Sequence, residues 1–296
     1  LSDRFGRKRA LLLSAVFFTI SAFWSAVPNS LTEFNIARVI GGVGVGMASM
    51  LSPLYIAEIA PAGIRGRLIS FNQFAIVSGI LLVYFVNYWI AGLGDQAWNT
   101  STGWRWMFGS ETIPALLFML SLAAIPESPR WLIKQGRVDE ATATLTRLSG
   151  AARAEHEVRE ITQAIALEGS SLRDLLRPGI RRTFVIGLSL AVLQQITGIN
   201  VFLYYAPEIF KSLGSGTDTA LLQTVVIGAC NVLFTVVAIR TVDHLGRRPL
   251  LMIGAAGMGA ALAGLGWSAY TSTTAAWTLI FILGYIACFA LSMGPV

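Results

Sequence analysis

Long apolar runs and short polar segments alternate along this chain. Eight runs are close to the roughly 20 residues that a helix needs to cross a membrane. They lie at 10–27, 31–56, 68–91, 106–125, 184–210, 220–241, 250–270 and 276–296. Turn-forming segments such as Pro28-Asn29-Ser30 and Gly214-Ser215-Gly216 separate them. The pattern predicts an all-α membrane protein.

Residues 126–179 have a different pattern. Charged and apolar residues alternate there, for example over 138–145 and 157–161, which is typical of short amphipathic helices. The sequence therefore predicts three parts. These are a transmembrane part at 1–125, a helical linker on the cytoplasmic side at 126–179 and a second transmembrane part at 180–296.

Composition supports a membrane protein. Of the 296 residues, 54% are hydrophobic and 13% are charged, and the mean hydropathy is +0.65. Soluble domains usually carry about 25% charged residues.

The net charge of +6 could suggest a nucleic-acid ligand, but the positions of the charges argue against one. All but three of the 22 Lys and Arg residues lie in four segments: 1–9, 58–67, 126–182 and 240–248. Two predicted spans separate each pair of neighbouring segments, so all four can lie on the cytoplasmic side, where basic loops concentrate. We expect the lipid bilayer, and no nucleic acid, as the partner of this charge.

Catalytic and metal-binding patterns are absent from the sequence. Cys230 and Cys288 lie inside apolar runs, and the two histidines, His156 and His244, lie in separate polar segments. No spacing typical of a metal site or of a nucleophile with its base accompanies them. We expect no metal, no cofactor and no enzymatic activity.

The chain begins at Leu1 and ends inside an apolar run. The sequence alone therefore predicts an internal fragment that lacks both ends of the protein.

One polar pattern, D-x-x-G-[RK]-[RK], occurs twice. It is found at 3–8 and at 243–248, and an apolar run follows each copy. Repetition of a loop before a membrane span predicts two similar halves. The alternative is two unrelated cytoplasmic loops that are basic because such loops usually are.

Arg38 is a charge inside the second predicted span. A buried charge there usually faces the protein interior and has a partner, because it costs about 2.5–3.5 kcal/mol in the bilayer. Glu111 is the one candidate partner in the predicted spans, unless the partner precedes this chain. The alternative is an Arg that extends along the helix to the headgroups. Gly42 and Gly46, four residues apart, predict a close helix contact on the same span.

Amide side chains inside the predicted spans are the strongest candidates for ligand binding. They are Gln73, Gln194, Gln195, Asn200 and Asn231. Amides offer both donors and acceptors, as the hydroxyls of a neutral sugar require. Gly198 should weaken the helix beside them and Pro207 should break it, which is tolerated where a cavity is lined. The alternative is that the amides only join helices.

Acidic and basic residues are paired in the polar loops. Glu58 precedes Arg65 and Glu127 precedes Arg130, while each repeated loop carries its own pair, Asp3 with Arg7 and Asp243 with Arg247. They are either a solvated headgroup surface, where each pair contributes little, or bridges that form in one state and open in another.

Together these motifs resemble the sugar porter family of the major facilitator superfamily. The resemblance rests on 3–8, 243–248, 58–65, 126–132 and 194–200 followed by Tyr204-Tyr205. It implies two pseudo-symmetric helical bundles, with family helices 3–6 at 1–125 and family helices 7–10 at 180–296. It also implies a multi-pass protein, and we expect it in a bacterial inner membrane and as a monomer.

The resemblance also implies roles for individual residues. The five amides would contact the sugar, Tyr204 and Tyr205 would form the outer gate, and Arg38 would pair with an acidic, proton-carrying residue of the first family helix. The cytoplasmic latch would consist of Asp3, Arg7, Glu58, Arg65, Glu127, Arg130, Asp243 and Arg247. Ile80 departs from xylose carriers, which have Gln there, and matches hexose carriers.

We therefore expect a secondary transporter of a neutral monosaccharide, D-xylose or a hexose, that works by alternating access with proton symport. A sugar uniporter and a non-transporting sugar receptor remain the alternatives.

Overall fold

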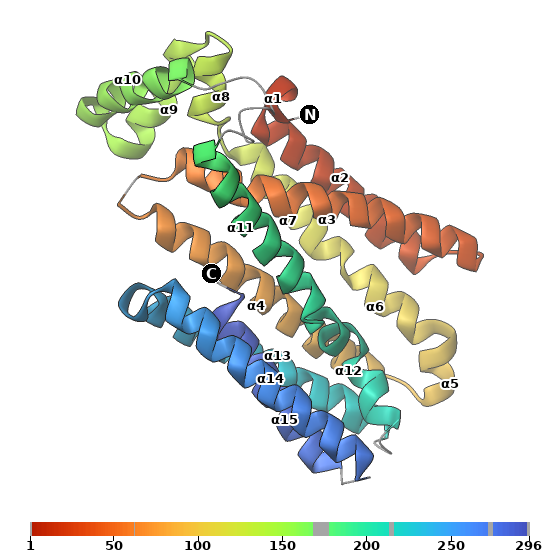
Figure 1. The fold of residues 1–296 in the computed structure, drawn as a ribbon. Helices are drawn as coiled ribbons and strands as arrows, with labels where there is room; N and C mark the ends of the chain where they lie inside the picture. Colours follow the sequence, from red (N-terminus) through yellow and green to blue (C-terminus); the bar gives the residue numbers. More distant parts are fainter. Residues whose placement is uncertain (1, 62, 168–177, 213–215, 272–274, 295–296) are drawn as a thin grey trace. The chain divides into compact units, whose positions relative to one another are not determined.

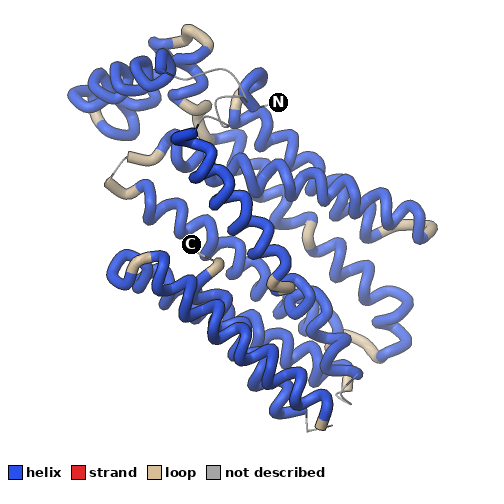
Figure 2. Tube along the Cα trace, viewed as in Figure 1, coloured by secondary structure: helices blue, strands red, loops and turns tan. Residues whose placement is uncertain are grey.

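The computed structural model describes residues 2–61, 63–167, 178–212, 216–271 and 275–294. Within these ranges every regular element is a helix (Figure 1, Figure 2). Seven helical stretches are long and apolar enough to cross a membrane, and an eighth, Trp277–Ser292, is apolar but shorter. The predicted all-α membrane fold is thus confirmed for the described part of the chain.

The fourth apolar stretch begins earlier than predicted, at Gln96, and ends at Ala124. It consists of α5 (Gln96–Trp98), a π-helical turn (Asn99–Gly103), α6 (Trp104–Ser110) and α7 (Thr112–Ala124). Asp95 starts the stretch, because its carboxylate accepts a hydrogen bond from the Trp98 amide at 2.8 Å.

The fifth apolar stretch is broken once. Gly198, with a φ of +80°, separates α11 (Pro178–Ile196) from α12 (Ile199–Ser212). Glycine adopts this left-handed conformation without steric cost, so its predicted effect is confirmed. The prediction that Pro207 breaks the helix is wrong, since α12 continues through it to Ser212. A hydroxyl group from another helix compensates for the proline, as described below.

The chain forms two compact units. The first is Leu1–Ile69 with Gly94–Gly169, and the second is Ser70–Leu93 with Ser170–Val296. The boundary falls inside α4 (Arg65–Ala91), whose residues from Ser70 onward belong to the second unit. The division at 126–179 into two bundles and a linker stays a prediction.

In the first unit, α2 (Arg7–Ala26) packs along α3 (Leu31–Ile59) and also contacts α6 and α7. Ser30 caps α3 by accepting a hydrogen bond from the Glu33 amide at 3.2 Å, and the Glu33 carboxylate accepts one from the Asn29 amide at 3.0 Å. These bonds satisfy the amides of Glu33 and Asn29 at the start of α3 and explain why the polar turn at 28–30 starts a helix.

The close contact between α2 and α3 uses other glycines than predicted. A side chain at Gly41 would collide with Ser21, and one at Gly44 would lie 3.1 Å from the Ser14 carbonyl oxygen. Gly42 and Gly46 face no described atom within 4 Å, so their predicted contact stays a prediction.

The linker region contains α8 (Pro129–Lys134), α9 (Val138–Ser149) and α10 (Ala151–Leu167). Trp131 and Leu132 are buried with Ala141, and apolar residues of α10 such as Ile161 pack on them. Three short amphipathic helices around a small core confirm the predicted character of this region.

The second unit contains α4 from Ser70 on, α11, α12, α13 (Thr217–Leu245), α14 (Arg247–Tyr270) and α15 (Ala275–Ser292). Helix α15 lies beside both α13 and α14 (Figure 1). The core of the second unit includes Phe210, Ile227, Ile282, Tyr285 and Ile286, each at most 1% exposed. This core supports the helices that carry the predicted amides.

Candidate functional site

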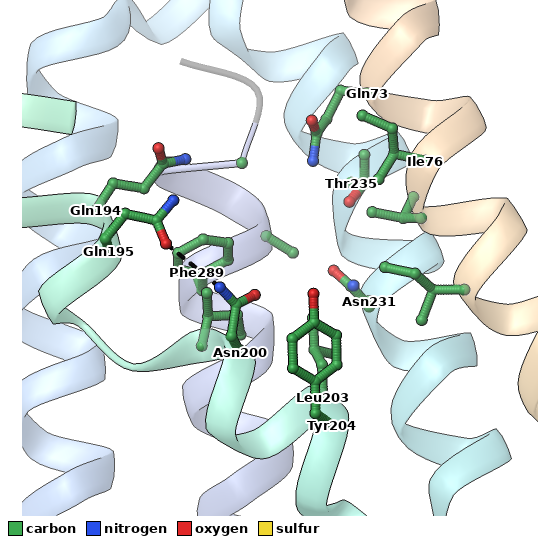
Figure 3. Close-up of a pocket in the computed structure, with 15 residues that line it drawn as sticks. Gln73, Ile76, Gln194, Gln195, Asn200, Leu203, Tyr204, Asn231, Thr235 and Phe289 are labelled. Atoms are coloured by element: carbon green, nitrogen blue, oxygen red, sulfur yellow. Dashed lines mark hydrogen bonds between the residues drawn. The ribbon is translucent and has the colours of Figure 1, made fainter. Parts of the chain in front are cut away.

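A cavity of about 200 Å³ lies within the second unit (Figure 3). Residues of α4, α11, α12, α13 and α15 line it. All five predicted amides are among them: Gln73, Gln194, Gln195, Asn200 and Asn231. Its volume is below the roughly 300–1,000 Å³ of pockets for drug-sized ligands. The space therefore suits a small ligand.

The break at Gly198 brings three of the amides together. Gln194 and Gln195 lie in the last turn of α11, and Asn200 lies in the first turn of α12. Asn200 Nδ2 donates to Gln195 Oε1 at 3.3 Å across the break. The change in chain direction lets residues from two consecutive helices face one space.

The other two amides come from different helices. Figure 3 shows Gln194 and Gln195 on one side of the cavity and Gln73 and Asn231 on the other. Gln73 belongs to α4 and Asn231 to α13. Amides on opposite walls can contact hydroxyl groups on both sides of one small molecule.

Several polar groups of the cavity lack a protein partner. Among the residues that the structure describes, the amides of Gln73 and Asn231 make no hydrogen bond, although Asn231 is only 5% exposed. Gln194 uses Nε2 to donate to the Met293 carbonyl at 2.9 Å, and its Oε1 has no described partner. Unmet donors and acceptors in a small space are a property of a site that binds a polar ligand.

The remaining wall is apolar and uncharged. Ile76, Ile80, Leu203 and Phe289 contribute carbon surface, and no described residue of the lining carries a formal charge. Ile80 lies two turns after Gln73 on the same face of α4, as predicted. A neutral ligand with hydroxyl groups and apolar faces fits this combination better than an ion does.

The two tyrosines predicted as a gate lie differently. Tyr204 borders the cavity, whereas Tyr205 is not among its described lining residues. Both are largely exposed in the described structure.

Thr235 is a cavity residue that the sequence reasoning missed. It is 1% exposed and its hydroxyl has no partner among the described residues. Its position four residues after Asn231, on the same helix face, was the signal that could have identified it.

The second group of predicted residues forms a charge cluster in the first unit, in which Arg7 and Glu58 are buried. Arg7 donates from Nε and Nη2 to the two Glu58 oxygens at 2.9 and 3.0 Å, and from Nη1 to Asp3 at 2.9 Å. The Ser128 hydroxyl also donates to Glu58, at 2.5 Å. Since the side chains of Arg7 and Glu58 are 8% and 6% exposed, these charges are not a solvated surface.

Glu127 completes the cluster by capping α2. Its Oε1 accepts hydrogen bonds from the amides of Arg7, Lys8 and Ser128 at 2.8, 3.0 and 2.9 Å. A carboxylate at a helix N-terminus meets both unpaired amides and the positive end of the helix dipole. Sequence alone could not show that a residue 120 positions away performs this role.

The glycine of the repeated motif has the same backbone conformation in both copies. Gly6 has φ 98° and ψ 160°, Gly246 has φ 81° and ψ 157°, and each is the N-cap of the next helix. A side chain on Gly6 would collide with Glu127. The shared geometry supports a true repeat.

Four of the predicted latch residues are not part of the described cluster around Arg7. The side chains of Asp243 and Arg247 are outside the described residues. Arg65 is exposed and donates to the Ala60 carbonyl at 3.4 Å. Arg130 is half-buried in the first turn of α8. The latch as a set stays a prediction.

Arg38 has a partner within this chain. Its Nη1 lies 3.4 Å from Glu111 Oε2, and its guanidinium lies 5.2 Å from the centre of the Phe108 ring. The candidate Glu111 is therefore its described partner. The pairing with an acidic residue of the first family helix stays a prediction.

No cluster of three His, Cys, Asp or Glu residues suited to a metal ion occurs in the described ranges.

Comparison with known proteins matches this chain to one family. The profile of the family described as "Sugar (and other) transporter" matches residues 1–296. The D-xylose-proton symporter of Escherichia coli K12 is 49% identical over 313 residues, covering 100% of this chain and 64% of that protein. The glucose facilitated diffusion protein of Zymomonas mobilis is 41% identical over 303 residues, covering 99% and 64%.

A solved structure agrees with these relatives. The proton:xylose symporter XylE bound to 6-bromo-6-deoxy-D-glucose superimposes with a TM-score of 0.85 at 48% identity, covering 99% of this chain and 66% of that one. The chain thus spans about two thirds of the proteins it matches, 64% in the case of the two relatives above.

Proposed function

The chain belongs to the sugar transporter family, and from this premise we propose that the protein is a secondary transporter of a neutral monosaccharide, D-xylose or a hexose. The observation that carries the proposal is the uncharged cavity with five amides, two of which have no partner in the described structure. The proposed activity is transport by alternating access, without a catalytic step, in a multi-pass protein of a bacterial inner membrane.

The five amides, Gln73, Gln194, Gln195, Asn200 and Asn231, are the proposed sugar contacts. Each can donate and accept, so a sugar hydroxyl can replace the water that occupies such groups otherwise. Apolar residues such as Ile76 and Phe289 would pack against the C–H faces of the ring. A sugar that binds outward-facing and inward-facing states with different affinity shifts the equilibrium between them by that difference.

The choice between pentose and hexose depends on few atoms. Ile80 lines the cavity two turns from Gln73 and offers a methyl surface where an amide would offer hydrogen bonds. Under the proposal it favours a hexose over D-xylose. One hydrogen-bonding group typically changes such preferences by about 1 kcal/mol.

Proton symport is the proposed mode of coupling. It is supported by the similarity to a D-xylose-proton symporter. Arg38 is the proposed coupling residue, since a charge at membrane depth that is paired with a carboxylate responds to protonation of that carboxylate. Facilitated diffusion is the second candidate, and the similarity to a glucose facilitated diffusion protein favours it.

Gate and latch residues complete the proposal. Tyr204, at the border of the cavity, and Tyr205 are the proposed outer gate, and the eight charged residues in the repeated and paired loops are the proposed cytoplasmic latch. Charged pairs that form in one state and open in the other would set the resting balance between states. The proposed unit of function is a monomer in the lipid bilayer.

Uptake by vesicles that contain the full-length protein tests this function. Radiolabelled D-xylose and D-glucose are supplied with and without a proton uncoupler. Accumulation that the uncoupler abolishes is expected for a symporter, while equilibration that ignores the uncoupler assigns facilitated diffusion. Absence of uptake of both sugars would contradict a transport function.

A further inference from the structure

Helix α12 contains a proline that should interrupt it. Pro207 has no amide hydrogen, so the carbonyl four residues earlier, that of Leu203, loses its helical donor. The structure supplies another donor: the Tyr84 hydroxyl, from α4, donates to the Leu203 carbonyl at 2.5 Å. The helix therefore continues through Pro207 with its backbone acceptor satisfied.

The position of Tyr84 depends on a glycine of α13. A side chain at Gly228 would lie 2.9 Å from Tyr84 Cδ2 and 3.1 Å from Leu81 Cδ1. Only a residue without a side chain lets α4 approach α13 this closely. The approach holds the Tyr84 ring where its hydroxyl reaches α12.

A second tyrosine supplies a hydrogen-bond donor at the other interruption of the same stretch, the break at Gly198. At Gly198 the Val201 amide bonds to the Gly198 carbonyl at 3.0 Å, so the Thr197 carbonyl lacks its regular helical donor. The Tyr285 hydroxyl, from α15, donates to it at 2.5 Å. The carbonyls of Leu203 and Thr197 thus accept hydrogen bonds from tyrosines of two different helices.

The Leu203 carbonyl is close to the residues that face the ligand. Leu203 and Tyr204 line the cavity, and Asn200 lies one turn earlier on α12. Across the cavity, α4 carries Gln73 and Ile80 as well as Tyr84. The bond from Tyr84 therefore joins the two helices whose spacing determines the width of the site, although Tyr84 is not among the cavity's described lining residues.

We propose that Tyr84 is a positioning residue that replaces the missing Pro207 amide and holds Asn200 and Tyr204 at the distance from α4 that the sugar requires. The inference rests on the proposed function. A carbonyl without a donor is costly at membrane depth, because little water reaches it. When the Tyr84 hydroxyl is absent, α12 shifts or frays near Leu203, and the sugar-competent arrangement becomes less populated.

A double-mutant cycle on the full-length protein tests the replacement directly. Tyr84→Phe removes only the hydroxyl, and Pro207→Ala restores an amide that can bond to the Leu203 carbonyl. Tyr84→Phe alone is expected to weaken binding of D-xylose or D-glucose by about fivefold, as for loss of one hydrogen bond in a membrane protein. In the Pro207→Ala background the same change is expected to have almost no effect.

Three matched variants separate this role from general packing. Tyr88→Phe removes a hydroxyl one turn away that has no partner in the described structure, so affinity should not change. Tyr285→Phe should weaken binding equally with or without Pro207, because its acceptor is Thr197. Pro53→Ala removes the interior proline of α3 and should not rescue Tyr84→Phe.

Hydrogen exchange over 199–212 gives a readout that does not depend on sugar. Tyr84→Phe should accelerate exchange there, and Pro207→Ala should reverse the acceleration. Unchanged exchange in Tyr84→Phe, or an equal loss of affinity in both backgrounds, would overturn the inference while leaving the proposed function intact. If the wild type binds neither sugar, the proposed function fails, and the exchange data alone decide the role of Tyr84.

Discussion

The charge cluster around Arg7 and the cavity around Asn231 are both polar regions among apolar helices, but their hydrogen bonding differs. In the cluster, Arg7 bonds to Glu58 and Asp3, and Glu127 accepts three backbone amides. In the cavity, Gln73 and Asn231 have no partner among the described residues. The charged groups of the cluster are paired with other groups of the protein, whereas the cavity contains donors and acceptors that no described group uses.

This difference separates a structural role from a binding role better than residue type does. Substitution of one member of a buried ion pair destabilises the fold, because it leaves the other charge buried and uncompensated. A buried amide without a partner is costly until a ligand or water reaches it. We therefore expect substitutions in the cluster to reduce stability, and substitutions in the cavity to reduce affinity.

Loss of Arg7 should have the largest effect. Arg7→Ala leaves the Glu58 carboxylate buried with only Ser128 as a described donor, and should lower the free energy of unfolding by about 3–5 kcal/mol. Thermal unfolding of the purified full-length protein measures this.

An exposed ion pair provides the control for Arg7. Arg137 bonds Glu140 at 2.6 Å on the surface of the linker, and this hydrogen bond lowers the pKa of the Glu140 carboxyl. Arg137→Ala should leave the unfolding temperature unchanged, since solvent screens the pair. Equal losses in both variants would show that burial of the cluster does not matter.

The glycine of the repeated motif should have the next largest effect. Gly6→Ala strains a backbone of φ 98° and pushes a methyl group into Glu127, so α2 loses its cap as well. We expect a loss of about 1–3 kcal/mol in stability. Gly246→Ala, where only Pro249 lies within 4 Å among the described atoms, should cost less. A larger loss at Gly246 would contradict the role of Glu127.

Gln194 should affect binding rather than stability. Gln194→Ala removes a proposed sugar contact and should weaken sugar affinity roughly tenfold, equivalent to about 1.4 kcal/mol. Calorimetric titration measures it, with Gln163→Ala on the exposed face of α10 as the control. Unaltered affinity beside a lowered unfolding temperature would reassign Gln194 to structure.

The smallest expected effect concerns selectivity. Ile80→Gln adds an amide to the α4 wall, and should raise the affinity for D-xylose relative to D-glucose by about fivefold, close to one hydrogen bond. Ile80→Leu keeps the wall apolar and should leave the ratio unchanged. Competition of the two sugars in one titration gives this ratio. A ratio that stays constant in Ile80→Gln would remove Ile80 from the site.

The sequence predicted the helices, and it singled out the five amides that line the cavity. Both are local features, since they depend on the length of apolar runs and on polar residues inside them. It could not predict which polar groups find partners. Glu127 caps α2 from 120 positions away, and Tyr84 compensates Pro207 from another helix. For the same reason Pro207 was expected to break a helix that continues.

The rotation of a helix about its axis is a second feature that the sequence did not reveal. Gly42 and Gly46 have the spacing of a contact face, but the described contact with α2 is made by Gly41 and Gly44, because spacing alone does not determine how a helix is rotated. Thr235 was missed since a single hydroxyl in a membrane helix usually bonds to its own backbone, and only the structure shows that it does not.

Titration of sugar into the full-length wild type and into Asn231→Leu tests whether the cavity is the sugar site. Leucine has the same branched arrangement of four side-chain heavy atoms as asparagine, and it removes both the donor and the acceptor of one partnerless amide. We expect the wild type to bind D-xylose or D-glucose, and Asn231→Leu, folded and equally stable, to bind it at least about tenfold more weakly. Equal binding by both proteins would contradict the assignment of the cavity as the sugar site.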